Sequence, residues 1–300
     1  MEQSRSAKQP GSSDASLPIR VRLLGTGGPR PDPERAGPAT LVQIGDENLL
    51  FDTGRGVVTQ MVRAGLPLES LKDVFITHHH FDHIGDMFDV ALSSWLQGRR
   101  HTMTFRGPPD TKRLLATLLT QVYDKDIEWR SDGESTHGGW APVEARDVAP
   151  GLVHETTDWR VYAETVVHGH GLDLPAAFLK RWICYGYRVE AQSKVVAISG
   201  DAVDCGGLRR LARGADVLVQ CCYLAGAEIT NDHYRQLATH TLACGDTVGK
   251  IAAECGVKTL VLTHHRPRDD AAMIERLRDE VSRDFSGRLI IANDLDEVVV

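Results

Sequence analysis

Short runs of apolar residues, separated by glycine, aspartate and proline, follow one another from residue 19 onward. Residues 19–28, 39–45 and 48–54 are rich in Val, Ile and Leu and are bounded by glycine or aspartate. This pattern predicts short strands in an antiparallel arrangement. Residues 56–65 then carry apolar positions at helical spacing and end at Gly65, which predicts a helix with a glycine C-cap. The alternation of strand and helix predicts an α/β protein.

Three later segments share one arrangement, a β-rich run that ends in residues able to bind a metal. Residues 73–80 end in histidines that open the sequence HHHFDH, residues 194–201 end in Asp201, and residues 258–265 reach His264. Loops at the carboxyl ends of strands commonly carry the chemistry of α/β proteins. The repetition of the arrangement indicates a site more strongly than any one of the three runs.

Two other segments have a structural interpretation. Residues 110–124 place leucines at helical spacing behind Asp110, which predicts an amphipathic packing helix capped by that aspartate. Residues 1–19 are rich in Ser, Gln, Pro and Gly and contain no apolar run long enough for a signal peptide or a membrane span. We therefore expect a disordered tail over residues 1–19 and a single domain over residues 20–300.

The composition changes this picture mainly by disfavouring some partners. With 300 residues, 42% of them hydrophobic, the chain can bury a large core. Its formal net charge of -7 gives no general attraction to nucleic acid. The six cysteines form no CxxC pair, as is typical of reduced thiols in a cytosolic protein. We expect a cytoplasmic protein without a membrane partner, and nucleic acid is not favoured as a partner.

The histidine-rich run has the spacing of a metal site. His78 and His80 are separated by one residue, so in an extended segment both side chains point the same way and can reach one ion. Asp82 and His83 follow on the turn and can face a second ion. Two-metal hydrolytic sites hold their ions roughly 3.5–4 Å apart, a gap that one carboxylate can bridge, and Asp201 is the natural bridge. For the first ion, the third ligand stays open among His154, His168 and His170.

Residues 78–83, HHHFDH, match the HxHxDH signature, and with them the chain resembles the metallo-β-lactamase superfamily. The segments LLGTGGPRP, LLFDTGRG, ETVVHGHG, YGYRVE, VVAISGD and LVLTHHRP occur in the order seen in its ribonuclease Z and arylsulfatase-like branch. The resemblance covers nearly the whole chain after the tail. It implies an αββα sandwich, in which two mixed β-sheets pack face to face with helices outside and metals at one sheet edge.

The resemblance also implies two Zn²⁺ ions, with Mn²⁺ or Fe²⁺ as alternatives, and a ligand for each position. His168 is preferred to His170 because "VVH" matches the family's third-histidine strand, and His264 is preferred to His265 because it ends the "LVLTH" run. The implied ligands are His78, His80 and His168 for the first ion, Asp82, His83 and His264 for the second, and Asp201 for both.

Two further residues receive roles from the resemblance. Asp52, in "FDTG", would orient the ligand loop through hydrogen bonds, the alternative being an ordinary turn residue. His240 would assist the leaving group, the alternative being a helix-start histidine without a catalytic duty. Bridging water between two zinc ions has its pKa lowered from about 15.7 towards about 7, which supplies hydroxide for attack. Asp82 would take the proton of that water.

The substrate is harder to infer, because the chain departs from the transfer RNA processing members. Those proteins carry a long arm between their "GYR" and "SGD" strands, where this chain has only VEAQSKVVAI. Phe81 stands where they commonly have glycine, and Gln220 and Cys221 stand where they have a His-Glu pair. These differences argue against RNA. Aromatic residues could instead line an apolar pocket over the metals or pack loops onto the core; they are Phe81, Trp129, Trp140, Phe178 and Trp182.

We therefore expect a dinuclear zinc hydrolase of a small-molecule ester, phosphoester, sulfate ester or similar activated bond, including hydrolytic dehalogenation. Phe81 and Trp182 are its candidate substrate-binding residues. The alternatives are a transfer RNA 3′-processing endonuclease like ribonuclease Z, an iron-dependent oxidoreductase of the same fold, and a metal-binding protein without catalysis. Dimers are common in the resembling branch, which suggests a homodimer by association only.

Overall fold

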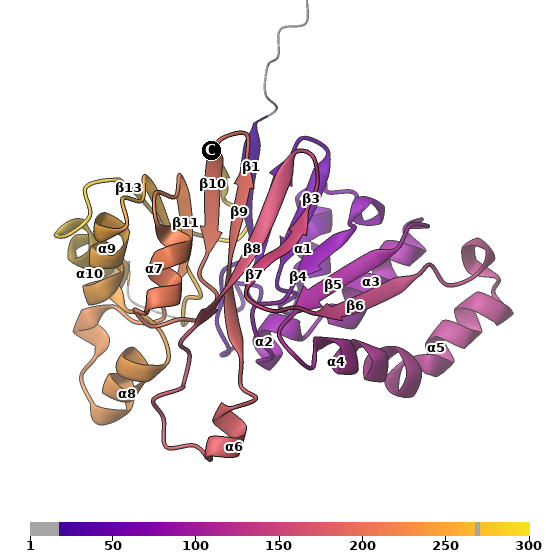
Figure 1. The fold of residues 1–300 in the computed structure, drawn as a ribbon, viewed down its shortest axis with the longest axis horizontal. Coiled ribbons are helices and arrows are strands. Elements are labelled where there is room, and N and C mark those ends of the chain that lie inside the picture. Colours follow the sequence, from indigo (N-terminus) through magenta and orange to yellow (C-terminus); the bar gives the residue numbers. More distant parts are fainter. Residues whose placement is uncertain (1–17, 268–270) are drawn as a thin grey trace, which may run out of the picture.

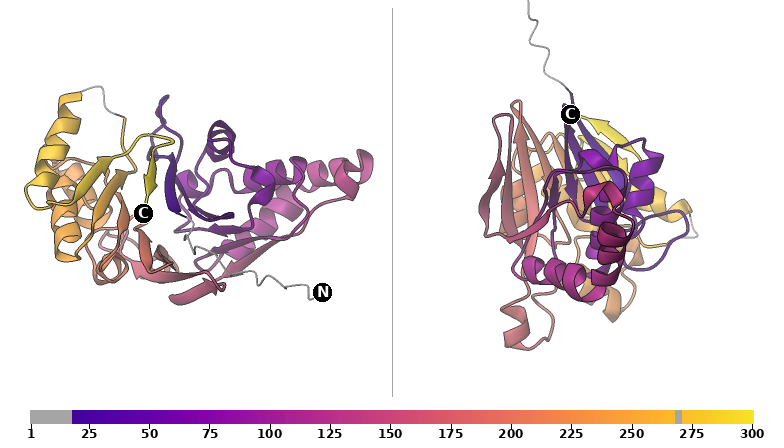
Figure 2. Two further views of the ribbon diagram at one scale, coloured as in Figure 1. Left: turned by 90° about the horizontal axis from the view of Figure 1, so that it is seen from above. Right: turned by 90° about the vertical axis from the view of Figure 1, so that its right-hand side faces the viewer.

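The computed structural model describes residues 18–267 and 271–300, and these residues form two seven-stranded sheets packed face to face (Figures 1 and 2). The tail expected over residues 1–19 lies almost wholly outside the described residues. Its last member, Ile19, is buried and begins the first strand. The two sheets with helices outside confirm the αββα sandwich that the resemblance implied.

The first sheet is antiparallel on one side and parallel on the other. From β14 to β3 neighbouring strands run antiparallel, as the alternating pattern near the start of the chain predicted, and from β3 to β6 they run parallel. In spatial order the strands are β14 (Glu297–Val299), β1 (Ile19–Gly25), β2 (Ala39–Ile44), β3 (Glu47–Phe51), β4 (Asp73–Phe75), β5 (Met103–Gly107) and β6 (Val143–Asp147).

The second sheet is likewise antiparallel on one side and parallel on the other. Strands from β7 to β10 pair antiparallel, and strands from β10 to β13 pair parallel. In spatial order they are β13 (Arg288–Ile291), β12 (Thr259–Thr263), β11 (Val217–Cys221), β10 (Lys194–Ile198), β9 (Cys184–Ala191), β8 (Trp159–Val166) and β7 (Gly151–Glu155). Only Gln192 and Ser193 connect β9 to β10, so no arm extends between these strands.

The core between the sheets is made by side chains from the inner face of each. Phe51 and Phe75 of the first sheet stack with ring centroids 5.0 Å apart, and both contact Tyr187 of the second sheet at 5.6 Å. Burial of such large rings supplies much of the driving force for the sheets to pack. Tyr187 also donates a hydrogen bond to the Ile76 carbonyl (2.7 Å), which fixes the start of the loop that carries the histidines.

Helices cover the outer faces and the ends of the sheets (Figure 1). Apolar residues of α1 and α3 pack on the first sheet, and those of α7, α9 and α10 on the second. In the described residues no helix is long and apolar enough to cross a bilayer. The helices are α1 (Val57–Arg63), α2 (Phe81–Ile84), α3 (Met87–Leu96), α4 (Thr111–Thr117), α5 (Asp124–Glu128), α6 (Ala176–Leu179), α7 (Gly206–Ala212), α8 (Asp232–His240), α9 (Gly245–Glu254) and α10 (Ala271–Ser282).

Of the two helix caps predicted from the sequence, the one at Gly65 is confirmed and the one at Asp110 is not. Gly65 adopts a left-handed conformation just after α1, as expected for a C-cap. Asp110 does precede α4, but the prediction that its side chain caps the helix is wrong. Its carboxylate binds Arg113 (2.8 Å), whereas Asp147, which ends the neighbouring β6, accepts a hydrogen bond from the Lys112 N–H at 2.8 Å. A residue distant in sequence therefore takes over the cap.

Candidate metal centre

The loops after five strands meet at one end of the sandwich. Asp52 follows β3, His264 follows β12, and His168 and Asp201 follow β8 and β10 within three residues. The loop after β4 carries His78 and His80 and leads into α2, which holds Asp82 and His83. All seven expected ligands therefore come together, and they form two groups whose candidate ligand atoms lie within 4.8 Å of one another.

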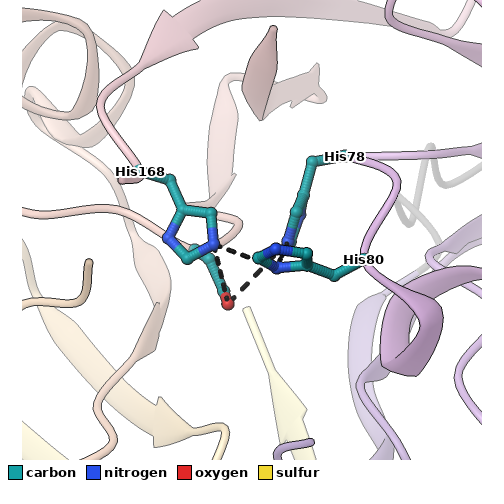
Figure 3. Close-up of side chains that lie close together, drawn as sticks. His78, His80 and His168 are labelled. Carbon is teal, nitrogen blue, oxygen red and sulfur yellow. Dashed lines mark hydrogen bonds and ion pairs between the residues drawn. The ribbon is translucent and has the colours of Figure 1, made fainter. Parts of the chain in front are cut away.

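The first group consists of three imidazoles and one carboxylate, and Figure 3 shows its imidazoles converging on one point. His80 Nδ1 lies 3.0 Å from His78 Nε2 and 3.1 Å from His168 Nε2. Asp201 Oδ2 lies 3.9 and 3.7 Å from the same two Nε2 atoms. Nitrogen and oxygen atoms bound at about 2.0–2.2 Å around one tetrahedral zinc are separated by distances of this order.

The second group shares Asp201 with the first. His83 Nε2 lies 3.4 Å from Asp201 Oδ1 and 3.8 Å from Asp82 Oδ2. His264 Nε2 lies 3.3 Å from Asp201 Oδ2 and 3.4 Å from Asp82 Oδ2. One carboxylate thus faces both groups, the position predicted for a bridging ligand.

Unsatisfied atoms show that this end of the protein fits a bound cation. Four buried ligand atoms, namely Asp82 Oδ2, His83 Nε2, Asp201 Oδ1 and His264 Nε2, have no hydrogen-bond partner among the described residues. Leaving buried polar atoms unpaired is costly, and a cluster of them marks a place for a missing ligand. Imidazoles and carboxylates are also the donor set that catalytic zinc prefers.

Asp52 orients three groups of the ligand loop. Its carboxylate accepts hydrogen bonds from the Thr77 N–H and hydroxyl, both at 2.8 Å, and lies 2.8 Å from His83 Nδ1. Because Nδ1 is engaged with Asp52, Nε2 of His83 faces the second group. Asp52 itself has φ near +63°, a left-handed conformation that is rare for a non-glycine residue and typical of functional sites.

His168 is oriented by a residue that the sequence did not point to. Its Nδ1 lies 2.7 Å from the Thr241 carbonyl at the end of α8, and its Nε2 faces the first group. His170 plays a supporting part, because its Nδ1 accepts the His168 N–H (3.1 Å) and its Nε2 donates to the Trp182 carbonyl (2.9 Å). A backbone carbonyl leaves no signal in side-chain identity, so only the helix position could have suggested Thr241.

Burial and neighbouring charges set the protonation of these groups. Burial lowers the pKa of His78 and His168, and it lowers the pKa of His80 to about 4, which favours neutral imidazoles that can bind a cation. Burial alone would raise the pKa of Asp201, but His264 and His83 hold it well below its usual range. Asp201 is therefore an ionised acceptor.

His265 and Cys221 lie near the candidate ligands but belong to neither ligand group. The His265 backbone runs beside Gly27 and Gly28, and its side chain is outside both ligand groups. Cys221, where the resembling proteins have a carboxylate, is fully buried against Asp201. Burial and the Asp201 carboxylate raise the pKa of Cys221, so it faces the site as a neutral thiol.

A pocket of about 280 Å³ opens over the two groups. Phe81 lines it with 64% of its surface exposed, and its expected contact with a substrate remains a prediction. Two residues that the sequence analysis did not select, Arg30 and His233, line it as well. The full lining is Pro29, Arg30, His80, Phe81, Asp82, His168, Asp201, Tyr223, His233, Leu237, Thr241, Leu242 and His264.

The other expected aromatic residues lie outside this lining. Trp182 contacts the ring of His80 (centroids 4.8 Å apart), donates a hydrogen bond to the His168 carbonyl at 2.9 Å and stacks on Phe178. It thus supports the ligands from behind. Trp140 packs on Trp95, and Trp129 lies in the projecting segment after α5, so neither of these two residues lines the pocket.

His240 and His154 are also outside the pocket lining. The His240 ring packs against Gly171, where an added Cβ would lie 2.1 Å from its Nδ1, and its carbonyl accepts the Gly169 N–H. Its proposed part in the reaction remains a prediction. His154 lies on β7 next to Trp159 and Asp73, and belongs to neither ligand group.

Comparison with known proteins places this geometry in a family. The family model described as Metallo-beta-lactamase superfamily matches residues 32–172. A ribonuclease Z of Mycolicibacterium paratuberculosis is 33% identical over 94% of this chain and 98% of its own length. Among solved structures, the metallo-beta-lactamase fold protein YhfI from Bacillus subtilis has a TM-score of 0.72 at 22% identity, covering 94% of this chain and 99% of that one.

The short form of human tRNase Z is similar in fold as well, with a TM-score of 0.65 at 22% identity over 93% of this chain and 98% of that one. These likenesses extend over nearly the full length of the chain, and the site lies at the strand ends where the motif-bearing loops meet. The chain belongs to the metallo-β-lactamase superfamily and is a metal-dependent hydrolase.

Proposed function

We propose that this protein is a dinuclear zinc-dependent phosphodiester hydrolase, with RNA as its substrate class. The observation that carries the proposal is the pair of ligand groups sharing Asp201 at the floor of the pocket. Two cations held by one bridging carboxylate are a recurrent device for displacement at phosphorus. The 33% identical relative is a ribonuclease by name, and a ribonuclease cleaves phosphodiester bonds. This similarity gives RNA more weight than the sequence analysis did.

The side chains present suit zinc more than a softer or a purely oxygen-binding metal. Five imidazoles and two carboxylates supply the seven donors, and no cysteine belongs to either group in the described residues. Imidazole suits zinc, copper, iron and nickel, and mixed nitrogen and oxygen ligands are typical of hydrolytic zinc. When bound, such ions supply hydroxide at neutral pH and polarise an oxygen of the scissile group.

The residues of the chain provide the rest of the reaction. Asp82, which lines the pocket, would accept the proton of the attacking water. Asp52 and the Thr241 carbonyl fix which nitrogen of His83 and His168 faces the site.

A second candidate is a small phosphodiester, and two observations favour it. The pocket holds about 280 Å³, and two residues alone connect β9 to β10. A small substrate would fill such a pocket without an arm to grip a folded RNA. The net charge of -7 points in the same direction.

The test combines metal content with substrate class. We expect about two zinc ions per chain by elemental analysis, and cleavage of bis(4-nitrophenyl) phosphate and of a transfer RNA precursor with a 3′ extension. Asp201→Ala should abolish both activities, with Asp216→Ala as the control. Cleavage of the aryl diester without cleavage of RNA would favour the small-substrate candidate. Two bound zinc ions with no phosphodiester cleaved would refute the proposal, and one iron per chain would contradict the zinc assignment.

A further inference from the structure

Two nitrogen-bearing side chains at the pocket have no part in the proposed reaction. Arg30 comes from the loop after β1, and His233 comes from the first turn of α8. Both are exposed to solvent, and both line the pocket that the metal ligands floor. Residues from two distant parts of the chain therefore meet over one site.

The loop that carries Arg30 is held against a ligand. Gly28 donates its N–H to the His265 carbonyl (3.0 Å), and an added Cβ at Gly28 would lie 3.1 Å from the His264 ring. Arg55 Nη2 donates hydrogen bonds to the carbonyls of Gly28 and Arg30, at 2.9 and 3.1 Å. The backbone of Arg30 is thus fixed, and its side chain starts from a defined place beside the site.

The guanidinium of Arg30 is uncommitted. Within residues 18–267 and 271–300, it forms no ion pair and no hydrogen bond. Arg55 of the same region differs, since it is occupied by two carbonyls. A guanidinium presents five N–H donors in a fixed fork that matches phosphate or carboxylate oxygens. At a pocket over a cation-binding floor, this fork is available to an anionic part of the substrate.

His233 is placed by the geometry of α8. The Asn231 side chain accepts the Tyr234 N–H (2.9 Å) and so fixes the start of the helix. His233, Leu237 and Thr241 follow at four-residue spacing and face the pocket together. The Thr241 carbonyl contacts the ligand His168, whereas His233 lies about 12 Å farther along the helix axis, at a rise of about 1.5 Å per residue. His233 is exposed to solvent and lines the pocket, so it lies on the open side of the pocket, which we call its mouth.

The side chains between mouth and floor are apolar or aromatic. Phe81, Tyr223, Leu237 and Leu242 form this wall. A ligand that reaches from the floor to the mouth would then have a planar or apolar middle and an anionic group at each end. A nucleotide unit with two phosphates has this chemistry.

We propose that Arg30 and His233 bind a second phosphate group of the substrate, one nucleotide unit away from the scissile phosphodiester. This inference rests on the proposed function and names the substrate more closely. The second phosphate comes from one of two sources, the next phosphodiester of an RNA chain or the terminal phosphate of a small nucleotide. Imidazole N–H and guanidinium both donate hydrogen bonds to either.

The first experiment measures binding without catalysis. Titration calorimetry on zinc-loaded protein compares adenosine 3′,5′-bisphosphate with adenosine 5′-monophosphate, neither of which contains a phosphodiester bond. We expect the bisphosphate to bind at least about tenfold more tightly, the order of one charge-assisted hydrogen bond. Arg30→Ala and His233→Ala should each reduce this preference to about threefold or less, and Arg30→Lys should restore part of it. Arg160→Ala, an exposed arginine on β8, is the matched control and should keep the full preference.

The second experiment identifies the source of the phosphate. On zinc-loaded protein, kcat/KM is compared for the dinucleotide ApA, its 3′-phosphorylated form and the trinucleotide ApApA. A gain of about tenfold with the terminal phosphate assigns the subsite to small nucleotides, and a gain with ApApA alone assigns it to an RNA chain. Whichever gain in kcat/KM is observed with wild-type protein should disappear in Arg30→Ala.

The outcomes separate this inference from the proposed function. Equal or undetectable affinity of wild-type protein for the two adenosine nucleotides would overturn the subsite, as would an unchanged preference in both Arg30→Ala and His233→Ala. If no phosphodiester is cleaved while the binding preference persists and depends on Arg30, the proposed function fails and the phosphate subsite stands.

Discussion

Asp201 and Asp216 lie at opposite ends of the same parallel strands and have opposite surroundings. Asp216 precedes β11, and its carboxylate accepts the Val195 N–H (2.9 Å) and pairs with Lys258 (2.7 Å) and Lys194 (3.6 Å). Asp201 follows β10, is also buried, lies among histidines and beside Cys221, and keeps one oxygen without a hydrogen-bond partner among the described residues. The first carboxylate is satisfied by its own chain, while the second is complete only with a ligand.

The comparison shows that burial of a carboxylate does not by itself indicate function. Burial would raise the pKa of both, and each is lowered for its own reason, by Lys258 and the Val195 amide at Asp216 and by His264 and His83 at Asp201. The two carboxylates differ in the type of residue that surrounds each of them. Lysines complete an ion pair, whereas imidazoles are themselves metal ligands and can share the carboxylate with a cation.

The largest expected effect is at Asp201. Asp201→Ala should lose most bound zinc and reduce phosphodiester hydrolysis by about 10³-fold or more, because both ligand groups lose their shared donor. Asp216→Ala should keep the metal content and the rate of wild-type protein. Elemental analysis and initial rates measure both. Retention of two zinc ions by Asp201→Ala would break the distinction between the two carboxylates.

A smaller loss is expected at Asp52, which orients ligands without belonging to either group. Asp52→Ala should weaken zinc binding about 10–100-fold, the usual effect of removing a hydrogen-bond partner of a metal-binding histidine. Competition with a chelator gives the affinity. An unchanged zinc affinity would show that the Thr77 and His83 contacts are dispensable.

Asp216 should affect stability and its pH dependence. Its lowered pKa means that the contribution to stability is present at neutral pH and is lost as pH falls through about 4, the unfolded value, towards the folded value. Asp216→Asn should therefore unfold about 1–3 kcal/mol more easily at pH 7. Urea titrations of metal-free protein at pH 7 and at pH 3.5 should show this deficit shrinking in acid. A deficit of equal size at both values would contradict the role of the charge.

The smallest effect is expected at His240. Its ring contacts Gly171 outside the pocket lining, so the structure predicts that His240→Ala keeps both metals and changes kcat by less than about threefold. A group that donated a proton to the leaving group would instead contribute about 10²–10⁴-fold. Steady-state rates across pH distinguish the two. A large loss in kcat would support the catalytic role that the resemblance implies for His240.

Several candidate ligands could be selected from the sequence because they lie shortly after a strand end, where a short apolar run and a metal-binding residue occur together. His78 and Asp201 could be selected in this way, and the resemblance decided between neighbours such as His168 and His170. Contacts made by the backbone could not be predicted, and the Thr241 carbonyl is an example.

Residues on long segments were also harder to place. Trp129 and Trp140 follow no strand end, and nothing in their spacing states which surface they meet. The Asp110 cap failed for a related reason, because Asp147 reaches the same amides from a strand that is adjacent only in the folded protein. His233 had a local signal in its four-residue spacing with Leu237 and Thr241, but that stripe is equally typical of ordinary packing.

The division of the ligands between the two halves of the chain bears on biosynthesis. His78, His80, Asp82 and His83 precede the second sheet, whereas His168, Asp201 and His264 come from it. A nascent chain that has produced only the residues up to the end of β6 holds half of each ligand group and no bridging carboxylate. The full set of candidate ligands is present only after β12 and His264 have been made.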